Sequence, residues 1–360
     1  MYKINRYPTT SDRSLKAHSA ADEYLLQHTK ELTLAGKQIT IYNDRFGYLS
    51  THLAQHNPTL VTSYKSQEKS ILANLQSNDI DITNVRFQNH LGEGAPTDIA
   101  LVRIPKSLDL LRLYFAEILA SANDDTVVVC SFMTKHFTKQ LLTVAGEHFE
   151  DVNQSLAWKK SRLLLLSKPK QKTGQELIHE VSYQDKTGTE HVLRQYYGVF
   201  SAKHIDYATQ FLLEHLDIDD TDNKILDLAS GNGVIAYACR LQNKEAEIHL
   251  LDDSQLAIAS SQLNLTDANT TFHHSDTMNE LPDSHFDLVV CNPPFHFEHE
   301  NTIDIALALF KGARRVLSAT GRFVCVANLH LNYKTHLEQL FTQVDSLAQN
   351  DKFVVYQCWK

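Results

Sequence analysis

Short apolar runs of strand length alternate with longer segments of helical spacing along most of this chain. In the second half the expected strands are 225–228, 248–251, 271–274, 286–291, 321–327 and 352–359. The expected helices are 234–239, 303–316 and 333–341. Such alternation predicts an α/β domain with an open, mostly parallel sheet, which binds ligands at the carboxyl ends of its strands.

The first half continues this alternation until it reaches a polar segment. Its later strands are expected at 126–130 and 162–167, and its later helices at 107–122 and 136–149. Residues 168–175 are polar and contain Pro169 and Gly174, which is typical of a linker. We therefore expect two domains, 1–172 and 173–360. The second should open with a hairpin, 178–183 paired with 191–196, followed by a helix over 205–216.

The first half also resembles the second in its apolar framework. Segments 39–47, 62–67 and 98–106 match 225–233, 250–255 and 287–295 at offsets of 186, 188 and 189. The polar residues differ: Ile41, Arg45, Tyr64, Arg103 and Lys106 stand opposite Asp227, Gly231, Asp252, Asn292 and Phe295. Strand-turn-helix patterning alone could produce such a match, but three near-equal offsets favour a duplication with a degenerate first copy.

The segment Asn292-Pro293-Pro294-Phe295 follows the apolar run 286–291 and so lies at the carboxyl end of a buried strand. Two prolines fix the backbone of the turn and leave its carbonyl groups as rigid acceptors. An amide oxygen, a fixed carbonyl and an aromatic face together suit an amine attached to a conjugated ring. Two acceptors would orient its delocalised lone pair, so catalysis would consist mainly of positioning. A proline-stiffened strand exit with a chance asparagine is the alternative.

A glycine-rich turn and two acidic residues precede this segment at earlier strand ends. The turn comprises Asp227, Ala229, Ser230, Gly231, Asn232 and Gly233, and a helix-like segment follows it. A turn of this kind lets a ligand approach the backbone. Asp252, nineteen residues after Gly233, is placed to accept from ribose hydroxyls, and Asp276 could accept from an adenine amine.

This series of motifs resembles the S-adenosylmethionine-dependent methyltransferases that modify exocyclic or amide nitrogens. Further segments resemble the RlmG type of ribosomal RNA guanine-N2 methyltransferase, which acts on the large ribosomal subunit. These segments are 20–26, 156–160, 198–201 and 350–355. One position departs from the family: Ala229 stands where the first glycine of the turn is usual, and alanine resists a positive φ.

The resemblance implies two tandem Rossmann-like class I methyltransferase domains. The first copy would be degenerate and would bind RNA, and the second would be catalytic, with a seven-stranded, mostly parallel sheet. S-adenosylmethionine would be the cofactor, and Phe200, Ser201 and Asp206 would contact its methionine end. The substrate would be the N2 amine of a guanine in 23S ribosomal RNA, modified before or during subunit assembly by a monomeric protein. The target amine would be held by Asn292 and the Pro293 carbonyl, with its base on Phe295.

Charge restricts where RNA could bind. The formal net charge of −9 argues against a simple nucleic-acid binder. The charge is unevenly distributed, because residues 1–190 sum to +1 and residues 191–360 to −10. RNA must therefore use local basic patches, of which Lys159, Lys160 and Arg162 beside Trp158 form the best. A second basic group, Lys311, Arg314 and Arg315, is better explained by its place near a helix carboxyl end.

Other composition features indicate a cytoplasmic protein without a metal. The five cysteines form no C-x-x-C pair and are expected to be reduced, and the amino terminus has no signal-peptide core or membrane-spanning run. The group His296, Glu298, His299 and Glu300 is more typical of a solvated loop than of a metal site.

Several alternatives remain open at this stage. The same turn would accept a guanine of 16S RNA, an adenine N6 amine or a protein glutamine amide. A non-enzymatic RNA-binding or assembly factor, in which both copies have decayed, is favoured only by Ala229.

Overall fold

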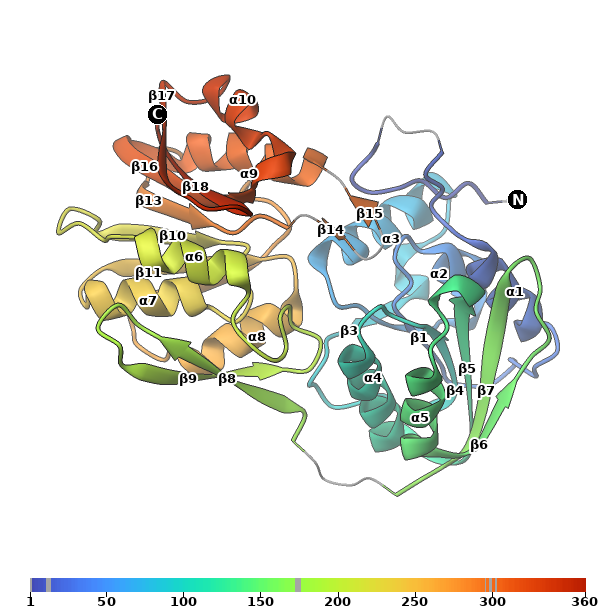
Figure 1. The fold of residues 1–360 in the computed structure, drawn as a ribbon. Helices are drawn as coiled ribbons and strands as arrows, with labels where there is room; N and C mark the ends of the chain where they lie inside the picture. Colours follow the sequence, from blue (N-terminus) through green and yellow to red (C-terminus); the bar gives the residue numbers. More distant parts are fainter. Residues whose placement is uncertain (1, 11–13, 172–175, 295, 298–299, 302) are drawn as a thin grey trace. The chain divides into compact units, whose positions relative to one another are not determined.

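The computed structural model describes the chain except for residues 1, 11–13, 172–175, 295, 298–299 and 302. The backbone forms two compact units, Met1–Glu176 and Leu177–Lys360, each with a seven-stranded sheet of its own (Figure 1). In the described part of the chain, no helix combines the length and apolar composition that a bilayer crossing requires.

The sheet of the second unit has the strand order β12-β11-β10-β13-β16-β18-β17. Its strands are β10 (Lys224–Leu228), β11 (Glu247–Asp252), β12 (Thr270–His274), β13 (Phe286–Cys291), β16 (Leu317–Asn328), β17 (Gln343–Gln349) and β18 (Phe353–Trp359). The strands from β12 to β16 pair in parallel, whereas β18 and β17 are antiparallel to their neighbours. The mostly parallel α/β sheet that the apolar pattern predicts is confirmed.

Helices pack on both faces of this sheet. They are α6 (Tyr207–His215), α7 (Val234–Gln242), α8 (Gln255–Asn264), α9 (Ile303–Val316) and α10 (Tyr333–Glu338), with a 3-10 turn at Leu329–Leu331. Leu212 of α6 and Ile235 of α7 belong to one apolar core, and Phe310 of α9 and Tyr333 of α10 to the other.

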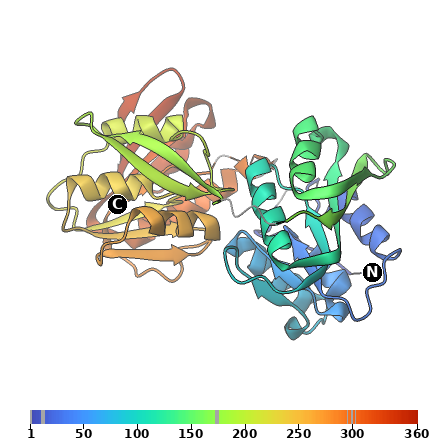
Figure 2. The same cartoon turned by 90° about the horizontal axis from the view of Figure 1, so that it is seen from below.

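Two antiparallel strand pairs complete the described part of the second unit. The strands β8 (Ile178–Gln184) and β9 (Glu190–Tyr196) pair where a hairpin is predicted, and they lie beside α8 (Figure 2). There the amide of Tyr196 donates to Ser260 Oγ at 2.9 Å. The strands β14 (His296–Phe297) and β15 (Glu300–Asn301) form a short antiparallel pair.

The first unit has the strand order β3-β2-β1-β4-β5-β7-β6, which is the same arrangement. Its strands are β1 (Ile39–Tyr42), β2 (Thr59–Val61), β3 (Arg86–Gln88), β4 (Thr97–Arg103), β5 (Ala122–Met133), β6 (Phe149–Gln154) and β7 (Ser161–Pro169). Its helices are α1 (Ala20–Thr29), α2 (Tyr48–Leu53), α3 (Lys65–Ser77), α4 (Leu108–Ser121) and α5 (Lys139–His148), with 3-10 turns at Ala54–His56, Ile82–Asn84 and Thr134–His136.

Strand pairing fixes which positions of the two units correspond. Ile41 pairs with Leu60 and Leu101, and Asp227 pairs with Leu250 and Val290. If Ile41 corresponds to Asp227, then Leu60 corresponds to Leu250 and Leu101 to Val290, and the offsets are 186, 190 and 189. The offset of 188 taken from the sequence for the middle segment was therefore wrong. Thr62, and not Tyr64, stands opposite Asp252. Shared strand order and pairing support a duplication.

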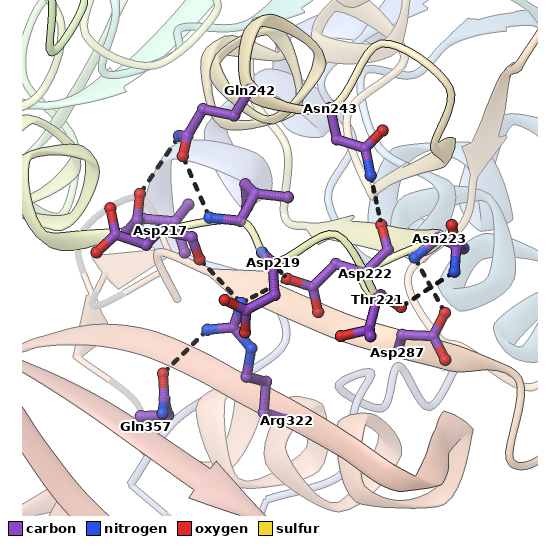
Figure 3. Close-up of polar contacts among 12 residues, drawn as sticks. Asp217, Asp219, Thr221, Asp222, Asn223, Gln242, Asn243, Asp287, Arg322 and Gln357 are labelled. Carbon is purple, nitrogen blue, oxygen red and sulfur yellow. Dashed lines mark hydrogen bonds and ion pairs between the residues drawn. The ribbon is translucent and has the colours of Figure 1, made fainter.

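A polar network anchors the amino end of the second sheet (Figure 3). Arg322 of β16 is buried, and its guanidinium pairs with the buried carboxylate of Asp222 and donates to Gln357 Oε1 at 3.0 Å. The carboxylate of Asp287 accepts from the amides of Asn223 and Lys224 at 3.2 and 3.1 Å. These contacts hold the segment that enters β10 against β13, β16 and β18.

The turn after β10 contains residues with left-handed backbone. Ala229, Gly231 and Gly233 have φ values of 60°, 55° and 80°. The amides of Ala229 and Ser230 both donate to the carbonyl of Leu251, at 2.8 and 3.2 Å, so hydrogen bonds to the neighbouring strand hold Ala229 in this conformation. Alanine therefore occupies a conformation that its Cβ disfavours by about 1–2 kcal/mol.

We expect the Ala229→Gly variant to be more stable than the natural chain. Glycine removes the left-handed strain but loses more backbone entropy on folding, which leaves a net gain of about 0.5–1 kcal/mol. Urea unfolding measures this change. Gly231→Ala is the matched control, because φ is similarly positive and a Cβ there would meet no atom within 4 Å. The Gly231→Ala variant should be less stable than the natural chain. A lower stability of the Ala229→Gly variant would contradict the left-handed conformation of Ala229.

Candidate active site

The register of the second sheet brings the predicted site residues to one edge. Leu228 pairs with Leu251 and with Cys291, so Ala229, Asp252 and Asn292 follow at the same level on three neighbouring strands. The amide of Ser275 donates to the Asp252 carbonyl at 3.0 Å, which places Asp276 at the same edge. Four strand ends therefore contribute polar groups to a single region.

The carboxylate of Asp252 is fixed by backbone donors. It accepts from the amide of Gly231 at 2.9 Å and from the amide of Ser254 at 2.7 Å. Burial raises its pKa to about 6, although these two donors act in the opposite direction. The turn and the end of β11 thus form one rigid unit around a carboxylate that titrates at mildly acidic pH.

Two further oxygens of the turn are buried. Asp227 is fully buried, and its Oδ2 accepts from the amide of Ala236 at 3.0 Å; desolvation raises the pKa of this carboxyl well above its usual value. Within the part of the chain that the structure describes, Asp227 Oδ1 and Ser230 Oγ have no hydrogen-bond partner. Asn232 differs, because its amide donates to Gln195 Oε1 at 2.7 Å and its oxygen accepts from Val234.

The Asn292 amide has a defined orientation. Its Nδ2 donates to Asp206 Oδ2 at 3.1 Å and to Thr209 Oγ1 at 2.8 Å. Its Oδ1 is buried and, among the described residues, has no partner. An ionised carboxylate can only accept, so the end of the amide that faces Asp206 must be the nitrogen. The site therefore presents one buried acceptor with a fixed direction.

Asp206 also begins α6, since its Oδ2 accepts from the amides of Ala208 and Thr209 at 3.0 and 3.2 Å. Sequence reasoning places it at the methionine end of a cofactor, and that role stays a prediction. Thr209 was missed by sequence reasoning. Its place three residues after a helix-capping aspartate on a buried face is the signal that could have found it.

Pro293 and Pro294 follow Asn292 directly at this edge. Pro293 is buried and Pro294 half-buried, whereas Phe295 lies outside the described residues. Phe200 is 71% exposed. Ser201 has a φ of 58°, and its hydroxyl donates to the carbonyl of His204 at 2.5 Å.

In the first unit the corresponding edge is filled by protein groups. Arg103, opposite Asn292, pairs with Asp22 at 2.8 Å and donates to Ser19 Oγ at 3.2 Å. Asn43, opposite Ala229, has a φ of 62° and donates through Nδ2 to the Arg103 carbonyl at 3.0 Å. Asp44 holds the start of α2 by accepting from the Ser50 amide at 2.7 Å, and burial raises its pKa to about 6.

The predicted RNA-binding lysines form the tip of a tight hairpin in the first unit. Trp158 and Ser161 exchange backbone hydrogen bonds of 2.9 and 2.8 Å, and Lys159 and Lys160 between them have φ values of 45° and 61°. Both lysines are exposed. The Lys159 ammonium lies 4.4 Å from the centre of the Trp158 ring and pairs with Glu23. Arg162 is half-buried and donates to Gln154 Oε1 at 3.3 Å.

One group in the described residues could hold a metal ion. Glu247, His249 and His285 offer ligand atoms within 4.8 Å of one another at the amino end of the second sheet. Hydrogen bonds already engage His249: Nε2 with Glu247 at 2.8 Å and Nδ1 with His273 at 2.9 Å. The side chains of His296, Glu298, His299 and Glu300 lie outside the described set.

Comparison with known proteins identifies both units. Residues 1–172 match the RLMG N-terminal domain, and residues 190–357 match the methyltransferase small domain. A solved structure, the T. thermophilus 16S rRNA N2 methyltransferase RsmC in complex with AdoMet and guanosine, has the same fold. Its TM-score is 0.78 at 20% identity, covering 100% of this chain and 98% of that one.

Two curated relatives align along the whole chain. The ribosomal RNA large subunit methyltransferase G of Erwinia tasmaniensis is 32% identical, covering 100% of this chain and 97% of the relative. The corresponding protein of Klebsiella pneumoniae strain 342 is also 32% identical, with coverage of 100% and 96%. The chain therefore belongs to the family of ribosomal RNA large subunit methyltransferases G.

Proposed function

We propose that this protein transfers a methyl group from S-adenosylmethionine to the exocyclic N2 amine of a guanine in large-subunit (23S) ribosomal RNA. The family of the chain supports the class of reaction. The observation that carries the choice of an amine is the buried Oδ1 of Asn292, which has no partner in the described chain and is directed by contacts to the amide nitrogen. Such an oxygen can accept a hydrogen bond from an N–H donor, and the guanine amine supplies one.

The chemistry depends on positioning. S-adenosylmethionine supplies an electrophilic methyl group on a sulfonium, so no strong base is required. The target guanine leaves its stack, and Asn292 Oδ1 and the Pro293 carbonyl accept the two amine hydrogens. This directs the lone pair of the amine toward the methyl group. The amine releases a proton to water after the transfer. Stacking of the base on Phe295 remains a prediction.

The turn after β10 fits such a cofactor. Asp252 would accept from the ribose hydroxyls and Asp276 from the adenine amine, and the backbone of Gly231–Gly233 would hold the methionine or ribose region. A Cβ at Gly231 would meet no atom within 4 Å, so the backbone there is accessible. Asp227 and Ser230 add buried oxygens that lack partners among the described residues. Ala229 adopts a left-handed conformation where the family usually has glycine, which supports an intact turn.

The first unit binds RNA at the carboxyl edge of its sheet. Exposed lysines follow the strands there: Lys106 after β4, Lys135 after β5, and Lys159 and Lys160 between β6 and β7. Cations on one edge neutralise phosphates without reading sequence. We expect the protein to act as a cytoplasmic monomer, without a metal ion, on RNA before or during subunit assembly.

We expect Asn292→Ala to lower methyl incorporation from labelled S-adenosylmethionine into deproteinised ribosomal RNA by about 100-fold or more, because one orienting hydrogen bond is lost. Asn243→Ala is the control. Asn243 donates to the Asp222 carbonyl at 3.2 Å, at the opposite end of the sheet, and its loss should leave activity unchanged. Wild-type incorporation by Asn292→Ala would refute the role of Asn292. Label in 16S RNA or in protein would refute the substrate.

Affinity for S-adenosylmethionine should be constant above neutral pH and should fall as pH decreases below about 6. The pKa of Asp252 is about 6, and only the ionised carboxylate offers both oxygens to the ribose hydroxyls. The Kd should then rise by up to about tenfold for each further pH unit. Calorimetry from pH 5 to pH 8 measures this. Asp252→Asn should bind weakly and lose the pH dependence, whereas Asp227→Asn should keep it.

Replacing Lys159 and Lys160 together by Asn and Gly should weaken RNA binding without harming the fold. Asn-Gly is favoured where both central residues of a hairpin turn have positive φ. Removing two phosphate contacts should reduce the slope of log K against log salt concentration by about 1.4 for single-stranded RNA. Lys37→Ala, which removes one exposed lysine just before β1, is the control. An unchanged slope would exclude this hairpin from the RNA site.

A further inference from the structure

The direction of the Asn292 carbonyl is set by two side chains of α6. Asp206 Oδ2 and Thr209 Oγ1 lie 3.1 and 2.8 Å from Asn292 Nδ2. An unrestrained amide could turn by 180° and would then offer two N–H donors in place of one acceptor. A donor would repel the hydrogens of an amine and would suit a carbonyl oxygen instead.

Each of the two partners makes a different contribution. The carboxylate of Asp206 excludes the reversed amide, because two oxygens would then face each other. Asp206 is itself held in place by the amides of Ala208 and Thr209. Thr209 is 6% exposed, so a shell of packed side chains fixes its hydroxyl. The amide nitrogen thus has two acceptors with little freedom to move.

The degenerate unit makes the same contact with different chemistry. Ser19 and Asp22 of the first unit correspond to Asp206 and Thr209, at an offset of 187, and Arg103 corresponds to Asn292. Arg103 contacts both Ser19 and Asp22, as Asn292 contacts both of their counterparts. The three positions therefore make an equivalent contact within each of the two units. Only the second unit uses it to hold an amide.

We propose that Asp206 and Thr209 are positioning residues that lock the Asn292 amide, so that the site accepts an N–H donor such as an exocyclic amine. This inference rests on the proposed function. It assigns Thr209 a role through Asn292 and not through contact with the substrate. It also gives Asp206 a role that does not require contact with the cofactor.

The test removes the hydroxyl group of Thr209, which accepts from Asn292, and keeps the shape of the side chain. Thr209→Val should lower kcat on ribosomal RNA by about 10- to 100-fold, because a misdirected acceptor no longer aligns the amine. The KM for S-adenosylmethionine should stay within about twofold, since the cofactor groups are untouched. Thr209→Ser should restore kcat. Thr40→Val is the matched control, because Thr40 is 2% exposed and its hydroxyl bonds to Thr97 in the first unit.

A second measurement does not depend on turnover. The side-chain amide protons of Asn292, assigned by their loss in Asn292→Asp, should exchange with water at least about tenfold faster in Thr209→Val than in the natural protein. Thr209→Ala provides the same comparison if the valine disturbs the core. A kcat within twofold of the natural value, a serine variant as defective as valine, or unchanged amide exchange would overturn the proposal. If the natural protein methylates no ribosomal RNA, the proposed function fails, and the exchange rates still decide whether the amide is locked.

Discussion

The site depends on the parallel register of β10, β11 and β13. Parallel pairing brings Leu228, Leu251 and Cys291 to one level, so the residues that follow them emerge side by side. The backbone of the turn is then bonded to the neighbouring strand through the Leu251 carbonyl and the Asp252 carboxylate. A shift of one residue would turn Asp227 to the other face of the sheet, away from the Ala236 amide, and would separate the turn from Asp252. The conformation of the turn after β10 therefore depends on the pairing of β10 with β11 and β13.

The two units separate what the fold needs from what the reaction needs. Both keep the strand order, the left-handed residue after the first strand and a left-handed glycine before the following helix, Gly47 or Gly233. Both also hold that helix with a buried carboxylate, from Asp44 in one unit and from Asp227 in the other. The loss of Asn292, Asp252 and Gly231 equivalents leaves the first fold intact. The fold therefore tolerates other residues at these positions, which agrees with the binding and catalytic roles proposed for them in the second unit.

The sequence predicts those strands and site residues whose signal lies within a few neighbouring positions. The central strands are long apolar runs and were predicted, but β6 and β17 at the sheet edges were not, because their residues are mainly polar and exposed. Asp252 and Asn292 could be found as polar residues at strand ends. Thr209 could be noticed as a buried polar residue after a helix cap, but its role could not be assigned, because its contact with Asn292 spans 83 residues. The opposition of Thr62 to Asp252 likewise depends on strand pairing, which three segment offsets alone do not determine.

The energetics of unpaired polar groups distinguish a functional edge from a structural one. A buried oxygen without a hydrogen bond destabilises a protein by about 1–3 kcal/mol, and native proteins contain few of them. In the described chain, Asp227, Ser230 and Asn292 each carry such an oxygen. Asp227 lies in β10 just before its last residue, Leu228, Ser230 follows β10, and Asn292 follows the adjacent strand β13. The first unit fills the same edge with Arg103, Asp22 and Asn43, which satisfy one another. The unpaired oxygens of the second unit are thus a local loss of stability that a bound ligand would offset, which supports the ligand site proposed at this edge.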